Sequence, residues 1–452
     1  MRNLSRTRRS TSVAVLAVVT LFGVTGSPAV TSATAAAPSA GTPKVLWEVS
    51  YDGGPGHHDY GRQVTTAGRS VFVAASTQDR DHPADFTVLR YSRHGKLQWQ
   101  RHVGGTFSRT GEPSDLLAIG TGVLVTGVTR DGAGNAALTT VRYDAHGHVR
   151  WQRRQALEDP VLPDDGPKLA LADDGSIRVG ASSGGDFLAL SYASNGARQW
   201  VRRVDASGSG DVATDIAVDG AGNAYLAGPA GDGFDGYTTV KFDEAGHVEW
   251  SVNVHGPIGS TLGPAFVDIA PDGTPVVSAS PESSCGVPQS RTWRLNPDGT
   301  EQWEMSYPAD PCESMQSAGM HVRADGSVVV LGTGGASNAD FATLSYSPAG
   351  ELEWARSLDS GGTDLAAAIA VDEAGRAYVT GVAAIGQPDD DALTASYDRE
   401  GHLRWQARTD VGSQSERPGG IALLDDGTVI VSGDYFDPDR LEDVFTLRYR
   451  QP

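Results

Sequence analysis

Short runs of alternating apolar and polar residues, separated by tight turns, extend through residues 44–452. The segment DIAVDGAGNAYLAG (Asp215–Gly228) has such a run on each side of an Asp-x-x-Gly turn, and AIAVDEAGRAYVTG (Ala368–Gly381) repeats the arrangement. This pattern is typical of a strand, a turn and a second strand. Helical periodicity is absent, and 56 glycines with 24 prolines suit turns better than helices. We therefore predict an all-β chain.

A second hairpin follows the first in each unit and carries the pattern aromatic-x-x-x-Gly-x-x-x-Trp. The glycine permits the positive φ that a short turn between two strands needs. The copies are YSRHGKLQW (Tyr91–Trp99), YDAHGHVRW (Tyr143–Trp151), YASNGARQW (Tyr192–Trp200), FDEAGHVEW (Phe242–Trp250), YSPAGELEW (Tyr346–Trp354) and YDREGHLRW (Tyr397–Trp405), with Leu295 replacing the aromatic residue in LNPDGTEQW. Each unit is thus predicted to be a meander of four antiparallel strands.

Eight tryptophans recur with a period near 50, which marks an array of one repeated unit. They are Trp47, Trp99, Trp151, Trp200, Trp250, Trp303, Trp354 and Trp405. We expect each indole to pack against the neighbouring unit rather than to bind a ligand. The ninth tryptophan, Trp293, lies out of register, and we expect it to pack in the core as well.

The two ends of the chain predict how the array closes. A lone strand at Lys44–Ser50 carries Trp47, whereas the last unit ends at Pro452 with three strands and no tryptophan strand. An open solenoid would need capping units, and none is visible. We predict an eight-bladed β-propeller of four-stranded antiparallel blades, in which the N-terminal strand completes the last blade and leaves no open edge.

Residues 1–36 have the features of a signal peptide: four arginines, an apolar run and the cleavage motif Ala33-Thr34-Ala35. The Arg8-Arg9 pair leaves twin-arginine export open beside the general route. The apolar run is too short to span a bilayer comfortably. We expect a short linker at residues 37–43, a propeller at 44–452 and a secreted protein, with attachment to the cell envelope left open.

Charge narrows the range of partners. The chain has 36 basic and 56 acidic residues, and loss of the four leader arginines leaves a formal charge of −24. Such a surface repels phosphate backbones and anionic membranes, so nucleic acid is not an expected partner. The acidic surface favours solubility, and we expect a monomer.

The segments IAVDGAGNAYLAG and YTTVKFDEAGHVEW resemble the SBBP-type β-propeller repeat of exported bacterial proteins. The chain is also similar to the wider group of tryptophan-docked propellers, which includes quinoprotein-like repeats and outer-membrane assembly lipoproteins. The resemblance implies blades and not one activity. Quinoprotein dehydrogenases use adjacent cysteines and a calcium-binding set, whereas Cys285 and Cys312 lie 27 residues apart. No cysteine lies near the cleavage site to carry a lipid anchor. We therefore predict no bound cofactor.

The links between strands predict which face of the propeller works. Links between the first and second strands and between the third and fourth are short, whereas the other links are long and irregular, as at residues 53–61, 104–114, 158–166 and 280–290. Binding sites usually lie on such variable loops, so we assign function to this long-loop face. Cys285 and Cys312 both fall on it, and a disulfide between them would contribute roughly 3–4 kcal/mol.

One residue of each innermost strand should lie near the mouth of the central channel. The eight are Gln63, Leu116, Lys168, Asp215, Asp268, His321, Ala368 and Gly420. Lys168, Asp215, Asp268 and His321 could bind a small polar ligand or a cation, or could act as acids and bases. The alternative is that they are ordinary polar residues of a water-filled channel.

Other candidate chemistry is weaker. His57, His58 and Asp59 lack a recognisable metal-ligand spacing, so we expect a solvated loop and no metal. No Gly-x-Ser-x-Gly, His-Glu-x-x-His or phosphate-binding loop occurs, and no catalytic residue is assigned.

The leading hypothesis is an exported, non-enzymatic propeller that binds a protein or glycan through its long-loop face. The alternative is a hydrolase or lyase at the channel mouth, acting on a polysaccharide or a small polar substrate. A quinone-dependent oxidoreductase is a weaker third.

Overall fold

The computed structural model describes residues 41–452, except residues 55–56, 79–84, 104–109, 159–165, 207, 209, 232–235, 256–262, 336–338, 385–389, 412–414 and 438–440. The predicted signal peptide at residues 1–36 and the first part of the predicted linker lie outside this range. All regular elements of the described residues are β-strands. Consequently no helix long and apolar enough to cross a membrane occurs among them.

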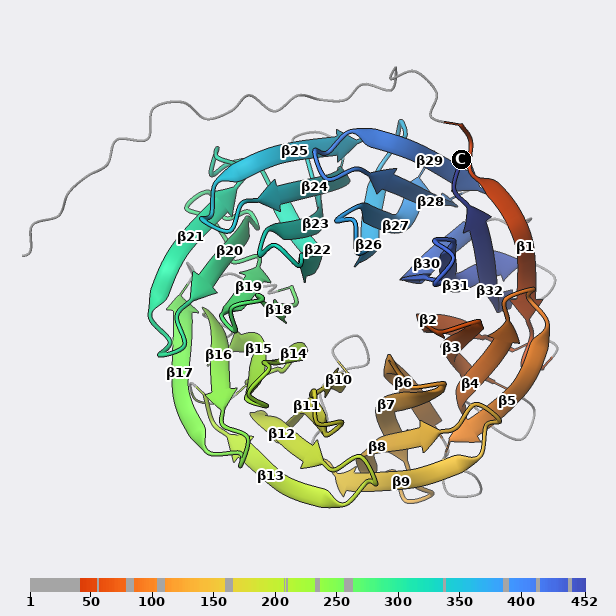
Figure 1. Cartoon of the computed structure of the whole chain (residues 1–452), viewed down its shortest axis with the longest axis horizontal. Helices are drawn as coiled ribbons and strands as arrows, with labels where there is room; N and C mark the ends of the chain where they lie inside the picture. Colours follow the sequence, from red (N-terminus) through yellow and green to blue (C-terminus); the bar gives the residue numbers. More distant parts are fainter. Residues whose placement is uncertain are drawn as a thin grey trace, which may run out of the picture. The chain divides into compact units, whose positions relative to one another are not determined.

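The strands form groups of four around a common axis, and within each group neighbouring strands run antiparallel (Figure 1). The innermost strands are β2 (Tyr60–Ala67), β6 (Thr110–Ile119), β10 (Lys168–Leu171), β14 (Asp215–Val218), β18 (Phe266–Ile269), β22 (Met315–Val322), β26 (Asp364–Val371) and β30 (Ser415–Leu423). The second strands are β3 (Ser70–Thr77), β7 (Gly122–Arg130), β11 (Ile177–Ser183), β15 (Ala224–Ala230), β19 (Pro275–Ala279), β23 (Val328–Gly334), β27 (Ala377–Ala384) and β31 (Val429–Asp437).

The two outer positions of each group follow the same order (Figure 1). The third strands are β4 (Asp85–Ser92), β8 (Ala136–Tyr143), β12 (Asp186–Tyr192), β16 (Gly236–Phe242), β20 (Ser290–Leu295), β24 (Asp340–Tyr346), β28 (Asp390–Tyr397) and β32 (Leu441–Arg450). The outermost strands are β1 (Lys44–Tyr51), β5 (Leu97–Val103), β9 (Val149–Ala156), β13 (Arg198–Val204), β17 (Val248–His255), β21 (Glu301–Tyr307), β25 (Leu352–Leu358) and β29 (Leu403–Thr409).

Six of the sheets are separate antiparallel meanders, from β2–β5 through β22–β25. The remaining eight strands form one sheet, because a single parallel pair, Asp390 with Ser415, joins β28 to β30. That sheet is therefore mixed, whereas the sequence predicted antiparallel pairing throughout. Within it β1 pairs antiparallel with β32, so the first strand of the chain lies beside the last.

The repeated tryptophan docks on the third-to-fourth-strand turn of the next sheet. The Trp200 Nε1–H donates to the Glu244 carbonyl at 2.9 Å, and its ring lies 6.0 Å from that of Phe242, between centroids. A Cβ on the turn glycine Gly246 would lie 2.5 Å from the indole. This turn glycine therefore has two roles, since it adopts a φ of 81° and leaves room for the tryptophan.

Hydrophobic clusters fill the spaces between consecutive sheets. One cluster joins Phe72 and Trp99 of the β2–β5 sheet to Val123, Val141 and Tyr143 of the β6–β9 sheet. Five of the eight repeated tryptophans are buried, and Trp47, Trp250 and Trp303 are half-buried. Trp293 is 1% exposed and belongs to the core, as expected from its place in the third strand of its unit.

Candidate functional site

The hydrogen-bond register shows which residues of the inner strands are equivalent. Asp115 pairs with Thr126 and Asp215 with Ala227, and these positions correspond to Lys168, which pairs with Gly180. The corresponding residues of β18 and β22 are Phe266 and Gly319. The complete set is Gln63, Asp115, Lys168, Asp215, Phe266, Gly319, Ala368 and Gly420.

Of the eight residues that the sequence analysis treated as equivalent on the innermost strands, three are thus not at the equivalent position. Leu116 lies one residue, and Asp268 and His321 lie two residues, beyond the equivalent position. The cause is that apolar alternation has a period of two and leaves the register of a short strand undefined. The distance to the following turn glycine defines it, since Phe266 and Gly319 each precede theirs by seven residues, as Lys168 and Asp215 do.

Aspartates on three inner strands connect each strand to the next. Asp115 accepts hydrogen bonds from its neighbour Leu116 and from the Leu169 N–H of β10, the latter at 2.7 Å. Asp215 accepts in the same way from Ile216 and from Val267 of β18. Asp268 accepts from Ile269 and from Val322 of β22. These carboxylates satisfy backbone donors that would otherwise face the channel.

The Lys168 ammonium interacts electrostatically with two of these aspartates, Asp115 and Asp215. Burial raises the pKa of Asp215 to about 7, while the Val267 N–H bond and the Lys168 ammonium act in the opposite direction. Burial also raises the pKa of Asp115, again opposed by Lys168. Among the described residues, the Lys168 ammonium has no hydrogen bond or ion pair. It is therefore available to a ligand.

Asp268 and His321 form a separate pair, toward the short-turn end of the channel. The His321 Nδ1 lies 3.6 Å from an Asp268 carboxylate oxygen, and both side chains are partly exposed. The four residues singled out from the sequence thus divide into Lys168 with Asp215 and Asp268 with His321.

A cavity of about 250 Å³ opens at the mouth of the channel on the long-loop face. Four inner strands and one second strand contribute its walls. The lining residues are Gly61, Arg62, Gln63, Pro113, Ser114, Lys168, Arg417, Pro418, Gly419 and Asp434. Three of these side chains are cationic and one is acidic, so the mouth is basic in a protein with a strongly negative formal charge. The sequence analysis placed Gln63 and Lys168 at the channel mouth but none of the other lining residues; the arginines gave no periodic signal.

Asp434 is the acidic wall of this mouth cavity. Its side chain is buried, and burial raises its pKa to about 7, against the opposing effect of Arg417 and Arg62. Glu442 raises the pKa further through charge repulsion. Asp434 therefore changes charge near neutral pH, inside a cavity that otherwise carries positive charge.

Buried aspartates next to the inner strands accept hydrogen bonds from backbone N–H groups of the long links. Asp59 is fully buried, contrary to the solvated loop expected for it, and it accepts from the backbone N–H groups of Gly53 and Gln78. Asp211 occupies the equivalent position before β14 and accepts from Ala206 and Gly231. Neighbouring carboxylates gather around both, since Asp52 and Asp443 lie close to Asp59. These groups could hold a cation, but their buried members are already bonded to backbone donors.

Cys285 and Cys312 form a disulfide with a Cα–Cα distance of 5.2 Å. It joins the β19–β20 link to the β21–β22 link, as the placement of the two cysteines predicted.

Not every link on the long-loop face is long, however. The link between β11 and β12 is the two-residue turn Gly184–Gly185, and both glycines have positive φ.

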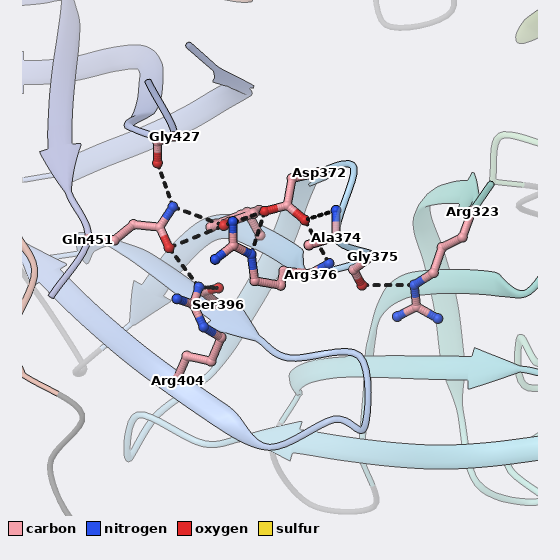
Figure 2. Close-up of polar contacts among 10 residues, drawn as sticks. Arg323, Asp372, Ala374, Gly375, Arg376, Ser396, Arg404, Gly427 and Gln451 are labelled. Atoms are coloured by element: carbon pink, nitrogen blue, oxygen red, sulfur yellow. Dashed lines mark hydrogen bonds and ion pairs between the residues drawn. The ribbon is translucent and has the colours of Figure 1, made fainter. Parts of the chain in front are cut away.

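The opposite, short-turn face has a larger cavity of about 600 Å³, between the β26–β27 and β30–β31 turns. Several of its polar groups bond to one another and to residues beside the cavity (Figure 2). Asp372 accepts from Ala374, Arg376 and Tyr378, and Gln451 accepts from Arg404. This network stabilises adjacent turns and the C-terminus, and leaves few groups for a ligand.

Comparison with known proteins supports the fold. Residues 199–234 match the model of the SBBP β-propeller repeat family. A europium-containing methanol dehydrogenase superposes with a TM-score of 0.53 at 11% identity, covering 90% of this chain and 93% of that chain. The chain therefore has a β-propeller fold and carries an SBBP repeat. Likeness at this identity shows the fold alone.

Two further propellers are less similar. The β-propeller domain of the trilobed protease from Pyrococcus furiosus has a TM-score of 0.45 at 12% identity, over 75% of this chain and 97% of that chain. A polysaccharide lyase, an ulvan lyase, has a TM-score of 0.46 at 9% identity, over 76% and 95%. Neither supports an argument about activity. No curated protein matches the chain in sequence.

Proposed function

We propose that this protein is an exported, non-enzymatic, eight-bladed β-propeller that binds a glycan at the channel mouth of its long-loop face. The observation that carries the proposal is the mouth cavity, where the Lys168 ammonium, which forms no hydrogen bond or ion pair with the described residues, lies with Arg417 and the backbone of two glycines. A protein ligand would need a standard interface of about 800 Å² on this partner. A cavity of about 250 Å³ instead suits a sugar-sized group.

Blade number and closure form part of this proposal. The pairing of β1 with β32 supports a last blade built from both ends of the chain. Contacts between successive inner strands, including β30 with β2, support a closed ring of eight. The single parallel pair between β28 and β30 is then a contact between two neighbouring blades.

A hydrolase or lyase at the channel mouth is the second candidate, and the pKa of Asp215 near 7 favours it. The hydrogen bonding of Asp215 and Asp268 opposes it, because each carboxylate accepts from backbone N–H groups of two strands. A quinone-dependent oxidoreductase gains no support, since the two cysteines of the chain are bonded to each other across 27 residues.

A binding assay against immobilised pectin, alginate, xylan and chitin tests the glycan proposal. Gln63→Trp places a large side chain in the mouth cavity, and Glu373→Trp does the same in the cavity of the short-turn face. We expect at least one polysaccharide to bind the wild type, the first variant to lose it and the second to retain it. Release of new reducing ends, abolished by Asp215→Asn in a folded protein, would instead establish the enzyme.

A further inference from the structure

The mouth cavity combines positive charge with a size that selects a small ligand. Lys168 comes from β10, Arg62 from β2 and Arg417 from β30, so the three cations approach from three strands. Arg417 is exposed, and among the described residues it forms neither a hydrogen bond nor an ion pair. Its guanidinium can therefore present two parallel N–H donors to a planar carboxylate.

The rest of the lining suits a saccharide. The prolines Pro113 and Pro418 supply apolar surface, while Gln63 and Ser114 supply polar groups. Ser114 already donates to the Pro167 carbonyl at 2.6 Å, so its oxygen remains as an acceptor. A volume of about 250 Å³ corresponds to roughly eight water molecules, which is the room that one six-carbon sugar ring needs.

We propose that the mouth cavity binds the carboxylate of a uronic acid unit of an acidic glycan, with Lys168 and Arg417 as its charge partners. This inference rests on the proposed glycan-binding function and adds the chemical class of the sugar. The cations act over a short range inside a partly enclosed cavity, where the surrounding protein strengthens their field relative to water. The acidic remainder of the surface repels anions that do not enter the cavity.

Asp434 makes this binding depend on pH. The groups that face it are Arg62 and Tyr60 of β2, Arg417 of β30 and Glu442 of β32. When Asp434 is ionised it repels a bound carboxylate, and when it is neutral its O–H can donate to it. Because its pKa is about 7, the neutral fraction falls about tenfold between pH 6 and pH 8, and the apparent affinity follows that fraction.

Calorimetric titration with trigalacturonate and with its methyl ester tests the proposal on the mature protein. The ester has the same shape without the charge. We expect the acid to bind at least tenfold more tightly than the ester. The double variant Lys168→Met with Arg417→Gln should lose at least tenfold in affinity for the acid. The control Lys96→Met with Arg69→Gln removes the same charge from the short-turn face and should change the affinity less than twofold.

The variant Asp434→Asn tests separately whether Asp434 causes the pH dependence of ligand binding. In the wild type we expect the dissociation constant for trigalacturonate to rise at least tenfold from pH 6 to pH 8. In the variant we expect a smaller rise, because Asp215, which interacts with Lys168, still ionises in this range. A thermal melt of each variant verifies that it is folded. A ligand affinity that is independent of pH in the wild type would contradict the assigned role of Asp434.

Several results would overturn the uronate assignment. These are equal binding of acid and ester, no binding of the acid, an equal loss in the control double variant, or tighter binding of inorganic phosphate than of the acid. A neutral polysaccharide that binds the wild type and is lost with Gln63→Trp would leave the glycan-binding function in place while rejecting the uronate. If the wild type bound neither trigalacturonate nor any neutral polysaccharide, the proposed glycan-binding function itself would be rejected.

Discussion

At the scale of single residues, the repeated tryptophan joins neighbouring blades by packing and by one hydrogen bond. Seven of the eight indoles donate to a turn carbonyl of the next sheet, as Trp47 does to Arg93 and Trp354 to Arg399. The buried Trp405 Nε1 has no acceptor among the described residues. The reason is topological: the neighbouring group of strands, β30–β32 with β1, has no turn between its third and fourth strands, because β32 ends there and β1 begins elsewhere in the chain.

This difference provides a matched pair of substitutions. Trp200→Phe and Trp405→Phe each reduce ring size in a buried site, but only the first breaks a hydrogen bond. We expect Trp200→Phe to lower the free energy of unfolding by about 1 kcal/mol more than Trp405→Phe. Urea denaturation followed by circular dichroism measures both values. Equal losses would show that the indole hydrogen bond contributes nothing to blade docking.

Asp434 makes stability depend on pH in a defined direction. Its pKa is about 7 in the folded protein, whereas an unperturbed aspartate titrates near 4. The folded state therefore binds more protons than the unfolded state between about pH 4 and pH 7, so stability falls as the pH rises through this window.

Asp434→Asn should remove this contribution. Relative to the wild type, we expect the variant to gain roughly 2.5 kcal/mol in unfolding free energy between pH 5 and pH 8. Chemical denaturation at the two pH values measures the difference. A constant offset between the two proteins would mean that Asp434 titrates normally.

At the scale of elements, sequence patterns predicted hairpins and turns better than strand register. Gly246 and the other turn glycines were recognisable because tight turns need positive φ at fixed positions. The identity of the channel-facing residues was harder, since Asp268 and Phe266 occupy the same short apolar strand and alternation alone does not distinguish them. The cavity required tertiary structure, because Arg62 and Arg417 come from strands at opposite ends of the chain.

Turn glycines of the two hairpin classes should differ in their tolerance of a side chain. Gly246 and Gly273 have φ of 81° and 82°, so alanine strains both backbones similarly. A Cβ at Gly246 would meet Trp200, whereas a Cβ at Gly273 would meet nothing within 4 Å. We expect Gly273→Ala to cost about 1 kcal/mol and Gly246→Ala at least 1 kcal/mol more. Thermal denaturation of the two variants tests this order, and the reverse order would contradict the docking role of the turn.

At the scale of the whole molecule, the proposed closed ring requires the first strand to complete the last blade. Deletion through Tyr51 removes β1 and exposes the backbone edge of β32. We expect the shortened protein to melt at least 10 °C below the mature protein and to self-associate. Differential scanning fluorimetry and gel filtration measure the two effects. An unchanged melting temperature with a monomeric elution volume would show that β1 does not complete the fold.

The net charge of the whole chain and the charge at the channel mouth have opposite signs. A formal charge of −20 over the whole sequence predicts poor binding of anions, yet the mouth of the channel gathers three cations. Composition could exclude nucleic acid as an expected partner, but it could not reveal a local basic site. Such a site arises only when the strands are arranged in space.

Hydrogen–deuterium exchange of residues 37–452, with and without trigalacturonate, locates the bound ligand and so tests binding at the channel mouth. We expect slower exchange at the first residues of β2, β6 and β30 and in β10, which surround the mouth cavity. The turns of the short-turn face, such as residues 372–376, should exchange at unchanged rates. Protection confined to those turns, or no protection anywhere at saturating ligand, would contradict the account.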